Sequence, residues 1–207
     1  MPLLFNKEIE NEIHFLIWEL TESLDELLSV SQLSSDDKET YSEISHLQKQ
    51  IEFLAGRLAI KKLCEIENIS FEGIIKDENG KPFLKNSEFE MSISHTINYI
   101  GVIMKKNSAI GIDIEKPRTQ LLKIVPRLFS PIEVAFIDNE IEKATLYWSA
   151  KEALYKLYGK RKVDFRENLF LDWEDGKLFG EIKMPDYEAR HKIIFFPLGQ
   201  YLTVIAH

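Results

Sequence analysis

The sequence predicts an α+β fold, in which helices and antiparallel strands are mixed along the chain. Two long segments, 43–67 and 141–158, repeat apolar residues at helical spacing. Segments near the N-terminus and from residue 168 onward alternate apolar and polar residues, which is typical of strands. Asn79-Gly80 is a strong hairpin-turn signal. The hairpins are the feature that favours the α+β class.

The N-terminal half is expected to begin with a strand and to continue into helices. Residues 13–17 alternate in polarity, which predicts the strand. Ser23 and Glu26 have capping-box spacing, so a short helix should start there. A polar helical region opens at 34–43, and a long amphipathic helix follows over 43–67.

The second half is expected to contain two more helices among several strands. Ser130, Pro131 and Glu133 combine an N-cap, a first-turn proline and a capping glutamate, so a helix begins there. A longer helix spans about 141–158, and Gly159 is placed to end it. Strand-like runs lie at 89–95, 99–105, 109–115, 168–173, 177–183, 191–198 and 201–206.

Composition and charge exclude several classes of protein. The chain has 207 residues and a formal net charge of −8, which argues against broad nucleic-acid binding. No apolar stretch approaches the ~20 residues of a membrane-spanning helix, and we expect a cytoplasmic protein that does not bind membranes. A single cysteine, Cys64, rules out an intrachain disulfide. We interpret it as a packing residue, and a nucleophile is the less favoured alternative.

Two carboxylates share one face of a predicted strand. In "GIDIE", residues 111–115, side chains alternate between faces, so Asp113 and Glu115 point away from the neighbouring isoleucines. A rise of ~3.3 Å per residue separates their Cα atoms by ~7 Å, close enough for both to reach one cation. Gly111 is expected to leave room on the same face.

The helix "WSAKEALYK", residues 148–156, carries a third carboxylate between two amines. At ~100° per residue, Trp148, Glu152 and Lys156 lie on one side, and Lys151 flanks them. The opposite, core-facing stripe contains Leu146, Ala150, Ala153 and Leu157. Asp113, Glu115 and Glu152 would supply three hard oxygen donors suited to Mg²⁺.

Each of these motifs has a plainer interpretation. An Asp-x-Glu pair on a strand is usually a solvated face, and a helix rich in Lys and Glu is usually a surface helix with weak ion pairs. The combination is more specific. "GIDIE" followed by "WSAKEALYK" resembles the double signature of the 4′-phosphopantetheinyl transferases, specifically their long, surfactin-synthetase-activating type. "AGRLAIKKL" at 55–63, "GKPFL" at 80–84 and "SISHT" at 92–96 resemble further segments of that family.

The resemblance implies a pseudo-dimer of two similar α/β halves, with coenzyme A bound in the cleft between them. The boundary is expected near the turn at Lys106–Ser108. Residues 1–107 would form an N-terminal half that contacts the coenzyme A 3′-phosphate. Residues 108–207 would carry the metal site and the docking surface for a carrier protein. Because the long form contains both halves in one chain, we expect a monomer.

The resemblance also implies a reaction. The phosphopantetheine arm of coenzyme A would pass to a serine hydroxyl of an apo carrier protein, which releases adenosine 3′,5′-bisphosphate. Mg²⁺, or alternatively Mn²⁺, would be held by Asp113, Glu115 and Glu152, while Lys151 and Lys156 neutralise phosphate charge. The base that takes the serine proton is Glu152 or a water bound to the metal, and the sequence leaves both open.

Further residues are assigned to coenzyme A by the same resemblance. His95 resembles the family histidine that contacts a phosphate, and Ser94 before it is assigned to coenzyme A as well. The alternative for a single histidine after a strand is a structural hydrogen bond. Arg57 and Lys81 are the leading candidates for the 3′-phosphate, and Lys61 is a weaker one because helix surfaces are rich in lysine.

The stretch "KPRTQLLKIVPR", residues 116–127, contains four basic residues and no acid. It is a candidate docking surface for an acidic carrier protein, with apolar contact area from the region of Leu121 and Phe129. A solvated basic loop and helix is an equal alternative. Two other functions remain open as well, a non-catalytic coenzyme A or carrier-binding module and an Mg²⁺-dependent hydrolase of nucleotide diphosphates.

Overall fold

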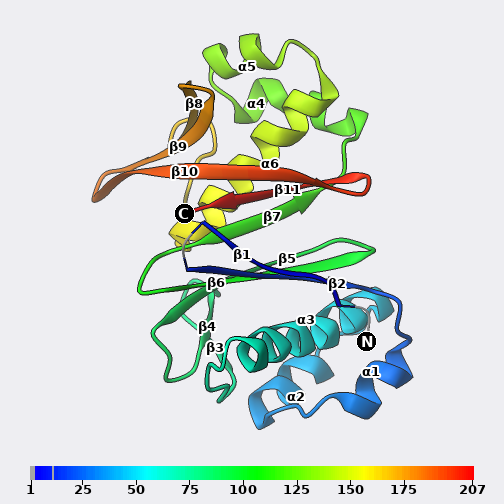
Figure 1. The fold of residues 1–207 in the computed structure, drawn as a ribbon. Coiled ribbons are helices and arrows are strands. Elements are labelled where there is room, and N and C mark those ends of the chain that lie inside the picture. Colours follow the sequence, from blue (N-terminus) through cyan, green and yellow to red (C-terminus); the bar gives the residue numbers. More distant parts are fainter. Residues whose placement is uncertain (1–2, 11) are drawn as a thin grey trace. The chain divides into compact units, whose positions relative to one another are not determined.

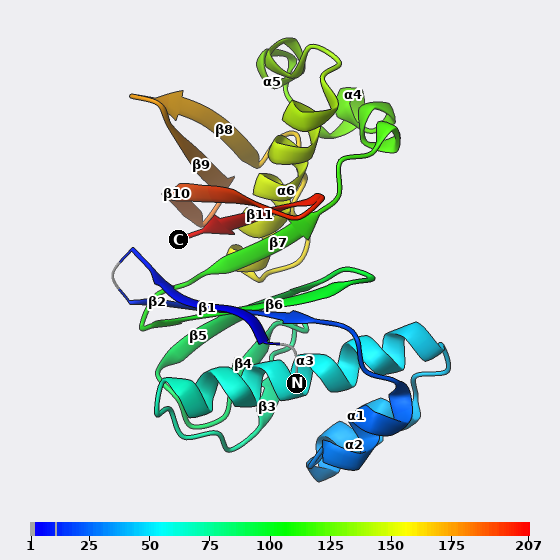
Figure 2. The same ribbon diagram turned by 45° about the vertical axis from the view of Figure 1, so that its right-hand side comes forward.

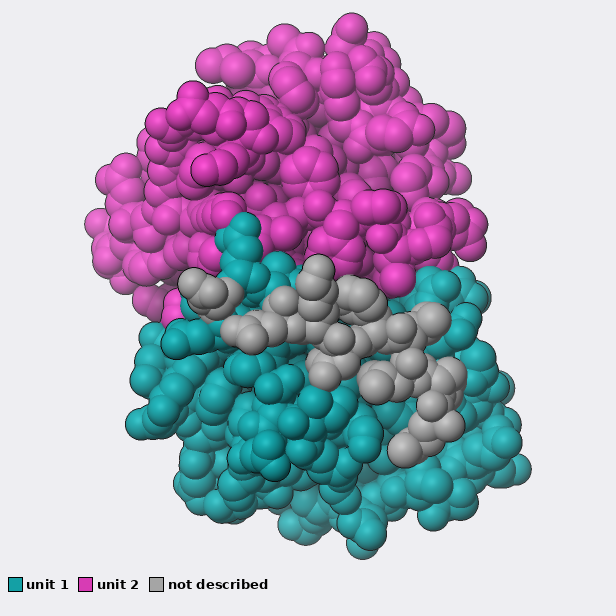
Figure 3. Space-filling view, in the orientation of Figure 1, with its two compact units in different colours: residues 1–75, 82–107 teal, residues 76–81, 108–207 magenta. Residues whose placement is uncertain are grey.

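The polypeptide divides into two compact units, coloured separately in Figure 3. The computed structural model describes residues 3–10 and 12–207. Unit 1 comprises residues 1–75 and 82–107, and unit 2 comprises residues 76–81 and 108–207. The short segment 76–81 interrupts unit 1 along the chain and groups with unit 2, which was not predicted from the sequence.

Unit 1 is an antiparallel sheet with a long helix packed on it (Figure 1). The strand order is β1-β2-β6-β5, and a small β3-β4 hairpin forms around the predicted Asn79-Gly80 turn. The strands are β1 (Leu3–Ile9), β2 (Ile13–Glu19), β3 (Ile74–Lys76), β4 (Pro82–Leu84), β5 (Phe89–His95) and β6 (Tyr99–Lys106). The helices are α1 (Leu24–Val30), α2 (Ser35–Ser42) and α3 (Leu47–Ile66).

The predicted local signals of unit 1 are confirmed with two differences. The Ser23–Glu26 capping box is formed at the start of α1. The long helix begins at Leu47 instead of Glu43, because residues 43–46 form the connection from α2. In β2, Leu16 and Trp18 pack under α3, but Ile17 on the other face is also fully buried. Simple alternation predicts a strand with one exposed face, whereas residues on both faces of β2 are buried.

Unit 2 is a five-stranded antiparallel sheet of order β7-β11-β10-β9-β8, against which α6 packs. Figure 2 shows α4 and α5 beside the N-terminal part of α6. The strands are β7 (Gly111–Glu115), β8 (Leu169–Glu174), β9 (Lys177–Met184), β10 (Tyr187–Leu198) and β11 (Tyr201–Ala206). The helices are a 3₁₀ turn (Thr119–Lys123), α4 (Val125–Leu128), α5 (Pro131–Ile137) and α6 (Ile141–Tyr158).

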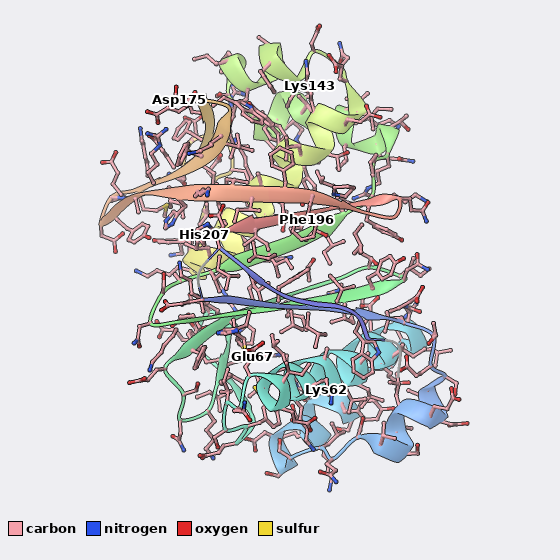
Figure 4. The ribbon with its side chains drawn as sticks, in the orientation of Figure 1. Lys62, Glu67, Lys143, Asp175, Phe196 and His207 are labelled. Atoms are coloured by element: carbon pink, nitrogen blue, oxygen red, sulfur yellow. The ribbon has the colours of Figure 1, made fainter. Side chains whose placement is uncertain are left out.

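The turns and caps of unit 2 follow from its residues. Ser130 and Glu133 form the predicted capping box of α5, and Gly159 ends α6 in the left-handed conformation at φ 73°. Asp175, labelled in Figure 4, and Gly176 both have positive φ and make the two-residue turn between β8 and β9. These elements give the mixed helix-and-strand class that the sequence predicts.

Two predictions about burial can be compared directly with the described chain. Cys64 is fully buried in the core of unit 1, and burial raises the pKa of its thiol to about 11, so the packing interpretation holds over a nucleophile. None of the helices in residues 3–10 and 12–207 combines the length and apolar character that crossing a bilayer requires.

Candidate functional site

The carboxylate face of β7 lies directly against α6. A Cβ added at Gly111 would stand 1.9 Å from the backbone oxygen of Ala153 and 2.7 Å from the nitrogen of Leu157. Glycine is therefore needed because the helix backbone occupies the space of a side chain. The expectation that Gly111 leaves open room on this face is wrong. The predicted alternation is right, however, because Asp113 and Glu115 share this face and meet side chains of α6.

Asp113 is held by two side chains from α6. Lys156 Nζ donates to Asp113 Oδ1 over 2.8 Å and also to the carbonyl oxygen of Ile112 over 3.0 Å. Ser149 Oγ donates to Asp113 Oδ2 over 2.7 Å, a contact that was not predicted from the sequence. Because Ser149 lies seven residues before Lys156, both project from the same side of the helix.

Glu115 is held at the exposed end of the same face. Trp148 Nε1 donates to Glu115 Oε2 over 3.2 Å, and Arg118 donates to the same oxygen over 3.1 Å. The tryptophan of the helical motif thus packs its ring beside Phe165 and uses its N–H on the strand carboxylate. The strand motif and the helix motif, about forty residues apart in sequence, form one set of contacts.

Glu152 completes the set electrostatically. Burial raises the pKa of the Glu152 carboxyl to about 7, and the negative charges of Asp113 and Glu115 act in the same direction. Lys156 opposes the shift without cancelling it. Three acidic side chains from β7 and α6 therefore lie close enough to repel one another, which is the electrostatic condition that a bound cation relieves.

The donor set suits Mg²⁺ chemically, because all three groups are carboxylates. In the described part of the chain, however, no three His, Cys, Asp or Glu side chains are already arranged to hold an ion. The hydrogen bonds explain this, since Asp113 is turned to Lys156 and Ser149, and Glu115 is turned to Trp148 and Arg118. A cation at this site would replace some of those partners.

Lys151, the other lysine of the motif, lies elsewhere. Its side chain is fully buried, with an exposed fraction of 0%, and its amine bonds to the Glu133 carboxylate and to two backbone carbonyls. Burial lowers the pKa of this amine, while the charge of Glu133 opposes the shift. The expectation that Lys151 faces a phosphate does not fit this buried position. A helical wheel predicts the direction of a side chain but not which element of the fold packs against it.

The candidate coenzyme A residues of unit 1 already have protein partners. Arg57 Nε donates to the buried Asp37 over 2.7 Å, and its guanidinium lies over the ring of Phe53. Lys61 donates to Gln32 over 3.0 Å. His95 lies 3.2 Å from both Glu52 and Lys49, and its side chain remains 47% exposed, whereas Ser94 is buried. Of these residues, His95 is thus the most accessible to a ligand.

Lys81 belongs to unit 2 and lies at the C-terminal end of α6. Its Nζ donates to the carbonyl oxygen of Leu157 over 3.2 Å, and its side chain passes close to Gly159. A cation there is favoured by the unpaired carbonyls and negative dipole end of the helix. The predicted assignment of Lys81 to the N-terminal half differs from this placement.

The basic stretch is exposed, but its expected apolar partners are not. Lys116, Arg118, Lys123 and Arg127 are all exposed. Leu121 and Phe129 themselves are buried in the core of unit 2, so contact area in this region would have to come from their neighbours. The neighbouring exposed apolar side chains are Ile132 (84%) and Phe136 (39%) on α5. Ile132 and Phe136 are exposed because one face of the short α5 points outward. The 7 residues of this helix are too few for apolar periodicity to predict which face that is.

A separate apolar pocket of about 480 Å³ lies in unit 2 between the start of α6 and the β10–β11 hairpin. Its lining includes Pro117, Leu146, Phe195 and Leu202. None of the predicted catalytic, metal or coenzyme A residues lines it, and the pocket was not predicted from the sequence.

Comparisons with known proteins agree on a family. The family model "ACPS: 4′-phosphopantetheinyl transferase superfamily" matches residues 109–202, which contain both motifs. A holo-[acyl-carrier-protein] synthase of Staphylococcus carnosus is 36% identical over 87 residues, 36% of this chain and 74% of that protein. A Synechocystis protein provisionally named a 4′-phosphopantetheinyl transferase is 30% identical over 144 residues. A Bacillus subtilis 4′-phosphopantetheinyl transferase is 28% identical over 143 residues.

The matches to the Synechocystis and Bacillus proteins cover only part of each chain. The chain spans 57% of the Synechocystis protein and 62% of the Bacillus protein, and these matches cover 62% and 63% of this chain. The Staphylococcus protein is covered far more completely, over a segment short enough to correspond to one unit. With that match, and with a family model whose residues contain both motifs, the chain belongs to the 4′-phosphopantetheinyl transferase superfamily.

Proposed function

We propose that this protein transfers the 4′-phosphopantetheine group of coenzyme A to a serine of an apo carrier protein and releases adenosine 3′,5′-bisphosphate. The observation that carries the proposal is the meeting of Asp113, Glu115 and Glu152 beside Lys156. Relatives of this chain are named 4′-phosphopantetheinyl transferase and holo-[acyl-carrier-protein] synthase. Transfer from a diphosphate needs charge neutralisation and positioning more than covalent catalysis, and this cluster is suited to both.

Asp113, Glu115 and Glu152 would hold Mg²⁺, or Mn²⁺ in its place. When bound, the ion would withdraw negative charge from the diphosphate of coenzyme A. Lys156 would then exchange its contact with Asp113 for phosphate oxygens, since its amine is on the carboxylate face and is part-exposed. Because the fold already places this amine on the carboxylate face, the exchange of one oxygen partner for another lets it stabilise developing charge.

The serine hydroxyl of the acceptor must lose a proton, and we assign that proton to the Glu152 carboxylate. A general base is most effective when its pKa is near the working pH. In the metal-free protein, burial and neighbouring negative charge raise the pKa of this group to about 7. A bound Mg²⁺ would lower that pKa, so the proton would reach Glu152 directly or through a water bound to the metal. Trp148 and Ser149 would keep the strand carboxylates in place through their hydrogen bonds during the reaction.

Coenzyme A contacts are proposed on grounds of accessibility. His95 and Lys81 are the leading residues, because one is half-exposed and the other extends an amine at the end of α6. Arg57, Lys61 and Ser94 are secondary, since Asp37 pairs with Arg57, Gln32 holds Lys61 and Ser94 is buried. Lys151 is left out of this set because its amine is buried.

The long, surfactin-synthetase-activating form is the finer assignment that we propose. Each unit by itself is an antiparallel sheet with one long helix, α3 in unit 1 and α6 in unit 2. Two such units in one chain are what a pseudo-dimer requires, and a monomer then suffices. The acceptor would dock on the exposed basic residues of 116–127 together with Ile132.

The test is to incubate the protein with coenzyme A, MgCl₂ and several apo carrier proteins and to measure the mass of each carrier. The proposal expects a gain of one phosphopantetheine group on at least one carrier, and no gain when its acceptor serine is replaced by alanine. Consumption of coenzyme A without any carrier would instead indicate a hydrolase. Binding of coenzyme A with neither outcome would indicate a non-catalytic module.

A further inference from the structure

Lys151 and Glu133 form an ion pair that is almost completely removed from solvent. The Nζ–Oε2 distance is 2.8 Å, and the side chains are 0% and 3% exposed. Lys151 lies on α6 next to Glu152, whereas Glu133 lies in the first turn of α5. The pair therefore links the helix of the carboxylate site to a neighbouring short helix.

Every hydrogen-bond donor of the Lys151 amine has an acceptor. An ammonium carries three N–H groups. These reach Glu133 Oε2 at 2.8 Å, the carbonyl oxygen of Leu128 at 3.2 Å and that of Phe165 at 2.7 Å. The amine also lies 4.7 Å from the centre of the Phe129 ring. No donor remains for a phosphate while this network is intact.

Glu133 is equally occupied. Its Oε2 accepts from the backbone N–H of Ser130 over 2.7 Å, and its Oε1 accepts from the backbone N–H of Leu171 over 3.0 Å. Through two side chains, α6 is thus bonded to the end of α4, the start of α5, the 165 loop and β8. These are backbone contacts, so the network defines where those segments run.

Stability alone does not account for a buried pair of this kind. Burying two charges costs several kcal/mol of desolvation, and replacing such a pair by apolar residues is often neutral or stabilising. A documented use of buried ionic groups is to select one arrangement of neighbouring segments. The segment selected here, residues 123–137, bears exposed Lys123, Arg127 and Ile132.

We propose that Lys151, acting through Glu133, is a positioning residue that holds this docking segment, residues 123–137, in register with the helix that carries Glu152. The inference rests on the proposed function, because the partner that reads this register is the carrier protein. An acidic surface fits Lys123 and Arg127, and an apolar side chain fits Ile132. The effect should therefore appear in recognition of the carrier and not in binding of coenzyme A.

The experiment compares Lys151→Met/Glu133→Gln with a matched control. The control, Lys62→Met/Glu65→Gln, makes the same changes in an exposed ion pair on α3, where the two atoms are 3.2 Å apart (Lys62, Figure 4). We expect the buried-pair variant to raise KM for the carrier about tenfold or more, with KM for coenzyme A unchanged. Hydrogen exchange should accelerate in 123–137 and 163–171 only. The control should match the wild type.

Several outcomes would overturn the inference. An unchanged KM for the carrier in a folded variant leaves Lys151 a purely structural residue, and a matching rise in KM for coenzyme A makes it a phosphate contact. If the variant does not fold, the wild type still decides, because binding of the carrier must slow hydrogen exchange in 123–137. Absence of that protection rejects the docking segment. Absence of any transfer by the wild type rejects the proposed function first, and this inference with it.

Discussion

Two faces of α6 lie on either side of Glu152, and each carries one lysine of the same motif. On the face toward β7, Lys156 is part-exposed and pairs with Asp113, which is one of three mutually repelling carboxylates. On the face toward α4 and α5, Lys151 is fully buried and pairs with Glu133. The first face retains negative charge that a ligand can neutralise, whereas the second is fully satisfied. Residue type alone does not separate these roles, but the partners do.

The largest effect on stability is expected from Lys151→Met alone. This change leaves the Glu133 charge buried without its cation, which typically costs about 3–5 kcal/mol of unfolding free energy. Urea unfolding measures it, with Lys62→Met as the exposed control. A loss below about 1 kcal/mol, as for an exposed pair, would mean that the two faces do not differ as described.

Lys156→Met should show the reverse profile. Its amine is part-exposed, so unfolding free energy should fall less than for Lys151→Met, but the rate of transfer to a carrier should fall by about 10²–10³-fold. The measurement is kcat at saturating coenzyme A and carrier, together with a melting curve. A variant that transfers normally while melting much earlier would assign Lys156 to structure.

The carboxylate face makes a pH prediction for the metal-free protein. Because folding raises the pKa of Glu152 to about 7, the folded state keeps a proton that the unfolded state releases, and stability falls as pH rises toward 7. Relative to the wild type, Glu152→Gln should therefore gain up to about 3 kcal/mol between pH 4.5 and 8. Urea unfolding in EDTA measures this gain. A difference independent of pH would contradict the repulsion.

The smallest effect tests the close approach of β7 to α6. Gly111→Ala places a methyl group against the Ala153 backbone and should cost about 1–3 kcal/mol. Gly180→Ala is the comparison, because its methyl group would meet the side chain of Leu154 and not a backbone. Thermal melting compares the two. Equal costs would indicate that the helix shifts away from β7 freely.

Local chemistry was predictable from the sequence wherever neighbours in the chain decide it. The caps at Ser23 and Ser130, the end of α6 at Gly159 and the shared face of Asp113 and Glu115 all depend on residues within a few positions. The prediction that the strand motif and the helix motif share one site came from the family resemblance. Spacing by itself does not say which strand a helix face meets.

Tertiary neighbours decided the rest. The sequence predicts apolar contact area in the region of Leu121 and Phe129. These two residues are buried, whereas Ile132 nearby is exposed. The sequence predicts Lys151 as a phosphate ligand, because it flanks Glu152 on a helical wheel. Nothing in the sequence marks Glu133 as its partner, since Glu133 already has a local role in the α5 cap. A residue with both a local and a long-range role is the hardest kind to assign from sequence.

The central claim is that Asp113, Glu115 and Glu152 act together on a divalent cation during transfer. The most direct test is the rate of phosphopantetheine transfer to an apo carrier across a titration of MgCl₂ after treatment with EDTA, for the wild type and Glu152→Gln. We expect no transfer in EDTA, recovery on addition of Mg²⁺ for the wild type, and no recovery for the variant. Full transfer in EDTA, or an undiminished rate for Glu152→Gln, would contradict the claim.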